Sequence, residues 1–350
     1  MSPINELNPK IILNKLQSKP LDTYKENKYI KFCISLAKLA SSATFRNPNV
    51  GACLVYHDQI IGQGYHQEFG KAHAEVNAIN SVKDQNKSLI EKATLYVTLE
   101  PCNHWGKTGP CTDYILKHNI KKLVFGNYDP NPKMQGKSIA FLKQNNVEII
   151  GPILEKECRE LIKPYITNLS HNRPYISLKW AQSSDFYIGK INERIKISNK
   201  ISDIYVHKMR SEHDAILVGS NTFLIDKPKL NTRLYPGKNP KIIILDRRNR
   251  IAKEKLTLDN STIVSSNSEL ETLLSELLND HNITRLMIEG GATIHRAFIE
   301  AGLWDTAHII TNNGLTLESG IPSPLLQGKL KSKQSLGNDS LQIIGNNMLE

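Results

Sequence analysis

The sequence predicts two α/β domains in succession. Its 350 residues exceed the size of one typical hydrophobic core and suit two domains of roughly 150 to 170 residues each. In both halves, short apolar runs of strand length alternate with segments of helical periodicity, which is typical of α/β layers. A polar stretch that ends in proline, 167–174 (TNLSHNRP), separates the halves. We therefore expect a loosely packed extension over residues 1–22, one domain over 23–170 and a second over 171–350.

The first domain opens with an amphipathic segment. From Tyr24 onward, apolar side chains recur at helical spacing and predict a helix. Two apolar runs, 50–56 and 60–65, are separated by a short polar turn and predict a hairpin. Further along we expect a helix from His73, a strand over 93–99, a helix from Cys111 and a strand over 121–126. The stripe of the opening helix consists of Tyr29, Ile30, Cys33, Leu36, Ala37 and Ala40.

The second domain begins with a predicted strand over 175–180. Further strand-length apolar runs lie at 215–218, 241–245, 261–264 and 285–288, and segment 270–278 has the periodicity of a helix. After the last run, Gly290 and Gly291 precede another predicted helix, IHRAFIEAGL. Glycine lets the backbone approach a ligand closely, and a helix N-terminus favours phosphate, so this step is a candidate phosphate cradle. A plain tight turn is the alternative.

The composition restricts the class of protein. Hydrophobic residues at 39% and charged residues at 23% are typical of globular proteins. The N-terminus lacks the apolar core of a secretory signal, and no run of about 18 apolar residues occurs, so we expect a soluble, cytoplasmic protein without a membrane partner. Five cysteines favour reduced thiols or metal ligands over a disulfide framework. The net charge of +11 leaves three interpretations open: a nucleic-acid partner, anionic phosphate ligands, or a lysine-rich surface.

Three potential zinc ligands and one carboxylate stand out in the first half. His73, Cys102 and Cys111 offer one imidazole and two thiolates, and Glu75 lies two residues after the histidine. Three protein ligands leave the fourth tetrahedral position to a water, whose pKa zinc lowers. In a deamination, Glu75 could move protons from that water to a ring nitrogen of the substrate and to the amino group that leaves as ammonia. This set is typical of hydrolytic zinc deaminases, in which Glu75 would be the general acid/base.

Taken singly, these residues have a simpler interpretation. A histidine often caps a helix, and a cysteine is often a small buried side chain. The combination of H-A-E, T-L-E-P-C and a second cysteine disfavours this alternative, although eight residues separate the cysteines where the common deaminase signature has two. We expect His73 and Cys102 at the starts of helices, where backbone N–H dipoles favour thiolates.

The first half resembles the bifunctional riboflavin-biosynthesis deaminase/reductase family. The similarity rests on segments 47–51 (NPNVG), 73–76 (HAEV), 98–102 (TLEPC), 109–111 (GPC) and 129–132 (DPNP), and the long cysteine spacing belongs to that pattern. The resemblance implies a cytidine-deaminase-like three-layer domain with Glu75 as proton donor. It also implies His73, Cys102 and Cys111 as zinc ligands and Asn49 as a contact to the pyrimidine. His104, between the cysteines, stays unassigned.

The second half resembles the reductase domain of the same family over most of 173–310. The matching segments are RPYISLKWAQSSD, VHKMRSEHDAILVGSNTFLIDKPKL and IEGGATI. No G-x-G-x-x-G follows a predicted strand, so a Rossmann site has no support. The resemblance implies instead a dihydrofolate-reductase-like α/β fold that uses NADPH to reduce the ribose of the deaminated product to a ribityl chain. The implied cofactor contacts are Ala181, Thr222, Asp226, Gly291, Ala292, Thr293, Ile294, His295, Arg296 and Ala297; the implied substrate contacts are Arg210, Leu230, Arg233 and Glu289.

Four charged residues of this half invite a more specific interpretation. Arg210 and Arg233 suit phosphate because a guanidinium presents a planar set of donors, although either could be a surface ion-pair partner. Lys179 is polar within the apolar run SLKWA, which suggests an amine that faces the sugar. Together with Asp226, it is a candidate for stabilising charge on the ribose oxygen. Lysines in strands also commonly extend to solvent instead.

Two loops depart from the family pattern. The family's S-x-D-G-K reads SSDFY at 183–187, so an aromatic residue replaces the turn glycine and we expect an altered loop geometry. Segment 192–196 (NERIK) lacks the tryptophan or serine that commonly makes a contact in the family. We therefore assign no contact of this kind to the segment.

The whole sequence therefore predicts a bifunctional enzyme that binds Zn²⁺ and NADPH, acts on a small phosphorylated pyrimidine, forms a homo-oligomer and has no nucleic-acid partner. One alternative is a zinc-dependent nucleic-acid base deaminase with a degenerate C-terminal domain, which the basic charge suggests. Another is a non-catalytic zinc- or nucleotide-binding scaffold. The long reductase-like half disfavours the first, and Glu75 beside three ligands disfavours the second.

Overall fold

The computed structural model describes residues 23–40, 44, 46–107, 109–132, 134–191, 193, 195–251, 262–266 and 269–347. The predicted extension over 1–22 and Ser261 lie outside these ranges. The chain divides into two compact units: one contains 50–65, 73–158 and the described residues before Lys38, and the other contains 38–49, 66–72 and the chain from Arg159 onward. The predicted boundary between residues 170 and 171 stays a prediction. None of the described helices is long and apolar enough to cross a membrane.

The first unit is built on a five-stranded sheet. Strand β1 pairs antiparallel with β2 and β3, whereas β3, β4 and β5 run parallel. The predicted hairpin is confirmed: its turn residues His57 and Asp58 have φ values of 45° and 61°, the positive values that tight hairpin turns require. In spatial order the strands are β2 (Gln59–Tyr65), β1 (Gly51–Tyr56), β3 (Thr94–Val97), β4 (Lys122–Phe125) and β5 (Glu148–Ile150).

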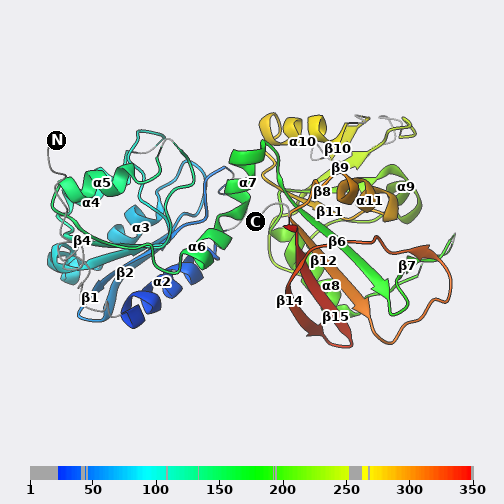
Figure 1. The fold of residues 1–350 in the computed structure, drawn as a ribbon, viewed down its shortest axis with the longest axis horizontal. Coiled ribbons are helices and arrows are strands. Elements are labelled where there is room, and N and C mark those ends of the chain that lie inside the picture. Colours follow the sequence, from blue (N-terminus) through cyan, green and yellow to red (C-terminus); the bar gives the residue numbers. More distant parts are fainter. Residues whose placement is uncertain are drawn as a thin grey trace, which may run out of the picture. The chain divides into compact units, whose positions relative to one another are not determined.

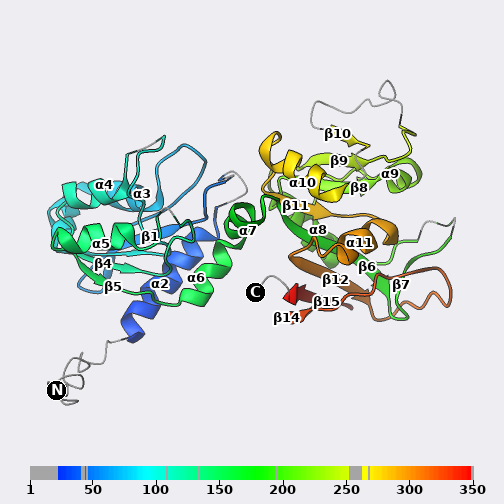
Figure 2. The ribbon, with the colours of Figure 1, turned by 45° about the horizontal axis from the view of Figure 1, so that its top comes forward.

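Helices cover both faces of this sheet. Figures 1 and 2 show α2 on one side and α3, α4 and α5 on the other, which gives the expected three layers. The predicted opening helix is confirmed as α2, which buries its apolar stripe against β1 and β3. The bounds are α2 (Thr23–Ala37), α3 (Ala74–Asn80), the 3₁₀ helix η2 (Asp84–Lys92), α4 (Cys111–Lys117), α5 (Lys137–Gln144) and α6 (Glu155–Leu161).

Two glycines let β2 pack directly on α3. A Cβ atom on Gly64 would lie 2.5 Å from the backbone nitrogen of Ala78, and one on Gly62 would lie 2.4 Å from its carbonyl oxygen. Both distances are too short for any side chain, so glycine is needed for the close approach. The contact fixes the helix that His73 precedes and whose first turn contains Glu75.

The second unit contains an eight-stranded sheet. Six neighbouring strands run parallel, and β15 pairs antiparallel with both β12 and β14. The predicted strands in 175–288 are confirmed as β6, β8, β9, β10 and β11. In spatial order the strands are β10 (Thr262–Ser265), β9 (Lys241–Leu245), β8 (Ala215–Gly219), β11 (Arg285–Ile288), β6 (Tyr175–Ser183), β12 (Thr306–Asn312), β15 (Asp339–Gly345) and β14 (Lys329–Leu336). Strands β7 (Tyr187–Gly189) and β13 (Ile321–Pro322) form a small separate pair.

Each face of this sheet has its own apolar core. Leucines of α10 and Phe298 of α11 pack with Trp180 on one face, whereas Val206 and Met209 of α8 pack with Ile216 on the other. Figure 2 shows the same helices around the sheet. The bounds are α7 (Lys163–His171), α8 (Lys200–Ser211), α9 (Ser220–Asp226), α10 (Leu270–Asn279) and α11 (Ala292–Glu300).

The polar stretch between the predicted domains is partly helical. Residues 167–171 form the C-terminal part of α7, which has Pro164 in its first turn, ends at His171 and is followed by Asn172 as C-cap. Asn172 has a φ of 48°, a left-handed value that asparagine tolerates at a helix C-terminus. Polarity alone therefore did not separate a linker from a surface helix here.

Strand β14 forms an open edge of the large sheet. Its residues are exposed except for the last, and Lys329, Lys331 and Lys333 lie along it. Lysines on an edge strand disfavour pairing with a further strand because their charges would have to be buried or brought together.

Candidate active sites

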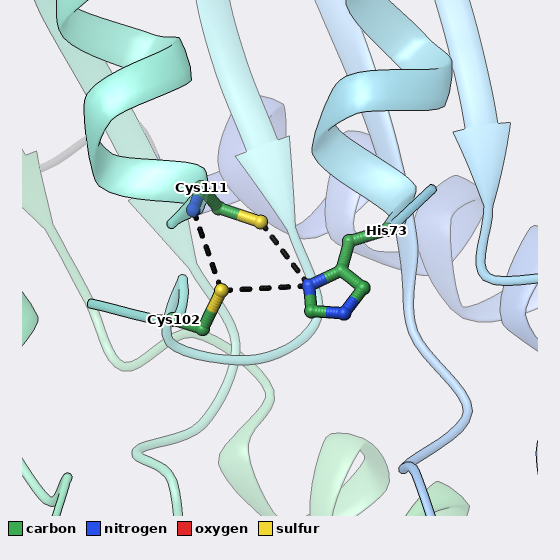
Figure 3. Close-up of side chains that lie close together, drawn as sticks. All are labelled: His73, Cys102 and Cys111. Atoms are coloured by element: carbon green, nitrogen blue, oxygen red, sulfur yellow. Dashed lines mark hydrogen bonds between the residues drawn. The ribbon is translucent and has the colours of Figure 1, made fainter. Parts of the chain in front are cut away.

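Three predicted zinc ligands meet between α3 and α4. His73 directly precedes α3, Cys102 follows β3 and Cys111 begins α4 (Figure 3). Nδ1 of His73 lies 3.3 Å from Sγ of Cys111 and 3.4 Å from Sγ of Cys102, and the three donor atoms lie within 4.8 Å of one another. Tetrahedral zinc, with bonds of about 2.0–2.3 Å, separates nitrogen and sulfur donors by about 3.5 Å. The donor set and its spacing therefore fit a zinc ion.

One expectation about this site is wrong. Cys102 does not begin a helix, because Pro101 and the loop that follows hold it in irregular structure; Cys111 begins one instead. The backbone N–H of Cys111 donates to Sγ of Cys102 at 3.3 Å. The helix start therefore supplies the expected donor to the thiolate, but from the second cysteine.

The two thiols are electrostatically coupled. The hydrogen bond from the thiol of Cys111 lowers the pKa of Cys102 to about 4, and the imidazole of His73 acts in the same direction. The same bond between the two side chains raises the pKa of Cys111 above the ordinary thiol value. The opposite shifts describe one pair that shares a proton, and a divalent cation would favour the thiolate on both sulfurs.

Glu75 lies beside this trio without belonging to it. Its side chain is 4% exposed in the first turn of α3, and it interacts with Cys111. Burial raises the pKa of Glu75 to about 7, while the neighbouring His73 opposes the shift. A carboxyl group that titrates near neutral pH can both accept and deliver a proton, which general acid/base catalysis requires.

A second buried carboxylate, Glu100, was not singled out from the sequence. It accepts hydrogen bonds from the backbone N–H groups of Asp129 at 3.1 Å and Gly136 at 2.9 Å. It also accepts from the hydroxyl of Ser138 at 2.5 Å and its N–H at 3.2 Å. Glu100 thus ties the 129–138 loop to the end of β3, two residues before Cys102. A carboxylate directly after an apolar strand was the only sequence signal.

The sequence also drew attention to Asn49 and His104 in the deaminase half. The side chain of Asn49 is buried, accepts from the hydroxyl of Thr44 at 2.9 Å and donates to the carbonyl of Ala40 at 3.5 Å. Its contact with a pyrimidine stays a prediction. His104 is exposed beside Trp105, which is 80% exposed.

In the second unit, three predicted site residues form one buried charged network. Lys179 on β6 faces Glu289, which directly follows β11, and their Nζ and Oε2 atoms lie 3.8 Å apart. Arg210 on α8 donates from Nε and Nη2 to the two carboxylate oxygens of Glu289 at 2.6 and 2.8 Å. Lys179 is therefore directed inward rather than to solvent. Its role near the sugar stays a prediction.

The charges in this network stabilise one another. Burial alone would raise the pKa of Glu289, but the Arg210 hydrogen bond and the Lys179 charge hold it at about 2. Burial lowers the pKa of Lys179, which Glu289 partly opposes. Glu289 occupies the edge of the Arg210 guanidinium formed by Nε and Nη2, so this pair of donors is not open to a phosphate.

Most of the predicted cofactor residues, 291–297, lie at the start of α11, and Thr222 lies close to Gly291. Gly291 directly precedes this helix, and a Cβ atom added to it would lie 3.7 Å from Oγ1 of Thr222. The expected strand, two glycines and helix are confirmed. The imidazole of His295 is fully buried near Trp180 and the Lys179 carbonyl. The groups that the helix start can offer to a bound phosphate are therefore its backbone N–H groups and the exposed side chains of Thr293 and Arg296. Ala181 is half-buried and Asp226 is exposed; both contacts stay predictions.

Comparison with known proteins covers both units. Residues 23–127 match the cytidine and deoxycytidylate deaminase zinc-binding region, and residues 174–318 match the RibD C-terminal domain. Riboflavin biosynthesis protein RibD of Aquifex aeolicus is 36% identical over 90% of this chain and 96% of its own.

Two solved structures are also similar. Acinetobacter baumannii RibD has a TM-score of 0.84 and 30% identity, over 93% of this chain and 99% of its own. A diaminohydroxyphosphoribosylaminopyrimidine deaminase/5-amino-6-(5-phosphoribosylamino)uracil reductase from Thermotoga maritima has a TM-score of 0.83 and 29% identity, with the same coverage of 93% and 99%.

The fold and the two sites define a zinc deaminase joined to an NADPH-dependent reductase. The chain belongs to the RibD family of bifunctional riboflavin-biosynthesis proteins. This assignment agrees with the predicted enzyme and disfavours both the nucleic-acid deaminase and the non-catalytic scaffold.

Proposed function

We propose that the enzyme first deaminates 2,5-diamino-6-(5-phosphoribosylamino)pyrimidin-4(3H)-one and then reduces the ribosyl group of 5-amino-6-(5-phosphoribosylamino)uracil to ribityl. The observation that carries the proposal is the trio of His73, Cys102 and Cys111 with the buried Glu75 beside it, in a chain that also has the Lys179, Arg210 and Glu289 network.

In the deamination, His73, Cys102 and Cys111 would hold zinc, which activates a water for attack on the amino-bearing ring carbon. Glu75 would accept one proton from the attacking water and pass it to the ring nitrogen. It would then accept the remaining proton of the new hydroxyl group and pass it to the amino group, so that ammonia leaves as the carbon–nitrogen bond breaks and a carbonyl forms. Because Glu75 is buried, its protonated form is more populated at neutral pH than that of an exposed glutamate. The side chain can therefore both accept and donate a proton near neutral pH. The 129–138 loop, tied by Glu100, keeps the Cys102 segment in place.

In the reduction, NADPH bound at the start of α11 would supply a hydride to the ribose carbon. Lys179 lies on the face of β6 that is directed to α8, beside Glu289, and its ammonium stabilises the negative charge that develops on the ribose oxygen. Arg233 binds the substrate phosphate, while Glu289 and Arg210 keep each other and Lys179 in position. Asp226 is a second candidate to assist at the cofactor.

The proposal also covers the location of the enzyme in the cell and its oligomeric state. We place the enzyme in the cytoplasm, because none of its five cysteines forms a disulfide, which suits a reducing compartment. We also expect a homo-oligomer. Cell fractionation and light scattering of the purified protein test these two statements. A monomer in light scattering would contradict the second.

Product mass analysis tests the reactions together. Zinc-loaded protein is incubated with the diaminopyrimidine substrate, without NADPH and then with it. The expected sequence is replacement of one amino group by oxygen, then a gain of two hydrogens with oxidation of NADPH. Protein treated with a chelator should lose the first step and still reduce the deaminated intermediate supplied directly. Absence of both steps in folded, zinc-loaded protein, or deamination of RNA instead, would contradict the proposal.

A further inference from the structure

The loop that bears Arg233 is held in one conformation before any ligand arrives. Within segment 230–239, called here the 230–239 loop, the backbone N–H of Thr232 donates to Oδ1 of Asn239 at 2.9 Å, and Tyr235 N–H donates to the Thr232 carbonyl at 2.9 Å. Leu230, at its start, is 3% exposed with a φ of 46°. A non-glycine residue keeps such a backbone only where its surroundings enforce it. The loop is therefore pre-organised.

Helix α8 anchors this loop at two points. Nη1 of Arg210 donates to the backbone carbonyl of Asn231 at 3.1 Å, and Leu234 N–H points to Nδ1 of His207 at 3.5 Å. Arg210 thereby commits three of its nitrogens, since Nε and Nη2 already bind Glu289. Arg210 therefore adds positive charge near an incoming anion and holds the loop, while the donor pair of Nε and Nη2 is used by Glu289.

Arg233 differs from Arg210 in this respect. Its side chain is exposed, and Nη1 donates to Oδ1 of Asn231 at 2.9 Å. The described residues give it no carboxylate partner, so its remaining N–H groups point to no competing anion. Asn231 thus accepts hydrogen bonds from both arginines. Its backbone carbonyl accepts from Arg210, and its side-chain oxygen accepts from Arg233.

We infer that Asn231 is a positioning residue that aims Arg233 at the substrate phosphate, and that Arg210 holds Asn231 in place from behind. A long exposed arginine otherwise samples many rotamers, and a neutral amide oxygen restricts it without neutralising its charge. The inference rests on the proposed function, because it requires Arg233 to bind the phosphate. It adds a residue that the family resemblance did not assign, together with a division of roles between the two arginines.

A double-mutant cycle on the reduction step tests the inference in the full-length, zinc-loaded protein. KM and kcat are measured for the deaminated substrate with its phosphate, and for the same compound without it. Asn231→Ala should raise KM for the phosphorylated compound about tenfold and leave kcat nearly unchanged, since one charge-assisted contact is loosened. It should change little for the compound without phosphate, and little more when added to Arg233→Ala.

Two further variants make the outcome decisive. Asn231→Asp keeps the oxygen acceptor but places a carboxylate against Arg233, so KM for the phosphorylated compound should rise more than in Asn231→Ala. It also serves if Asn231→Ala does not fold. Asn279→Ala, an exposed asparagine at the end of α10, is the matched control and should behave as wild type.

The failures are distinguishable. If Arg233→Ala leaves KM unchanged, the phosphate role of Arg233 in the proposed function is wrong, and the inference falls with it. If Arg233→Ala raises KM but Asn231→Ala does not, or if the Asn231→Ala effect persists undiminished in the Arg233→Ala protein, only the inference is overturned. An equal KM increase on the compound without phosphate would also overturn it, because that result indicates a general loop defect.

Discussion

At the scale of a single residue, replacement of Glu75 by glutamine separates proton transfer from metal binding. The amide keeps the size of the side chain but cannot shuttle a proton, so deamination should fall by about 10²–10⁴-fold. Zinc content, measured by elemental analysis, should stay at the wild-type level because the three ligands are untouched. Glu155→Gln, at an exposed position at the start of α6, is the control. Loss of zinc in Glu75→Gln would show that the carboxylate has a structural role instead.

Glu289 permits a prediction about stability. Its removal as Glu289→Gln leaves Arg210 and Lys179 buried without a counter-charge, which should lower the free energy of unfolding by about 3 kcal/mol at pH 7. Lys196→Gln breaks an exposed ion pair with Asp203 and should cost at most about 0.5 kcal/mol. Urea unfolding followed by fluorescence gives both values. Equal effects would mean that the buried network contributes no more than a surface pair.

The residues of the zinc trio could be anticipated because each belongs to a short motif. The helix that begins at Cys111 was predicted correctly, but the sequence wrongly suggested a helix start at Cys102, which lies in irregular structure. Glu100 and Asn231 could not be anticipated. Their roles depend on hydrogen bonds whose partners, such as Ser138 or Arg210, are brought close only by the fold.

At the scale of elements, the contact of β2 with α3 carries a prediction. Gly64→Ala would place a methyl group 2.5 Å from the Ala78 backbone nitrogen and force the helix away from the strand. We expect a loss of about 1–3 kcal/mol in unfolding free energy and weaker zinc retention, because His73 and Glu75 move with α3. The control is Gly106→Ala, where an added Cβ meets nothing within 4 Å. Unfolding titrations with parallel zinc analysis compare them. A Gly64→Ala protein with the unfolding free energy and zinc content of the wild type would contradict the prediction.

The same scale shows which elements a sequence reveals. The hairpin of β1 and β2 was recognisable because apolar runs flank a polar turn, and the parallel strands of the second unit are continuous apolar runs, as strands buried on both faces must be. Strand β14 (KLKSKQSL) has neither pattern, and it forms only because β15 pairs with it. Strand β14 was therefore not predicted, and neither were several helices, among them α5, α6 and α8.

At the scale of the whole molecule, three buried histidines make the reductase unit sensitive to acid. Burial lowers the pKa of His213 and of His295 to about 4 and that of His308 to about 3. In its neutral form, His213 accepts from Ser177, and Nδ1 of His308 lies 2.7 Å from the hydroxyl of Tyr205. Below pH 6.5 the unfolded chain binds protons that the folded chain does not, so stability falls with pH, by about 2 kcal/mol for each histidine at pH 5.

Unfolding in urea at pH 7.5 and pH 5 measures this loss. His213→Asn keeps a donor toward the Met209 carbonyl but cannot take up the proton, so its stability should differ less between the two pH values than that of the wild type. His281→Asn, at an exposed position, should show the full wild-type difference. An identical pH difference in His213→Asn would exclude this histidine as a source of acid sensitivity.

The row of lysines on β14 has a consequence for how copies of the chain can meet. Two identical edges placed side by side would bring like charges together along the whole strand, and the backbone groups between them would have to lose their water in the same step. The proposed homo-oligomer should therefore join through some other surface, and the large sheet should end at this strand in every assembly.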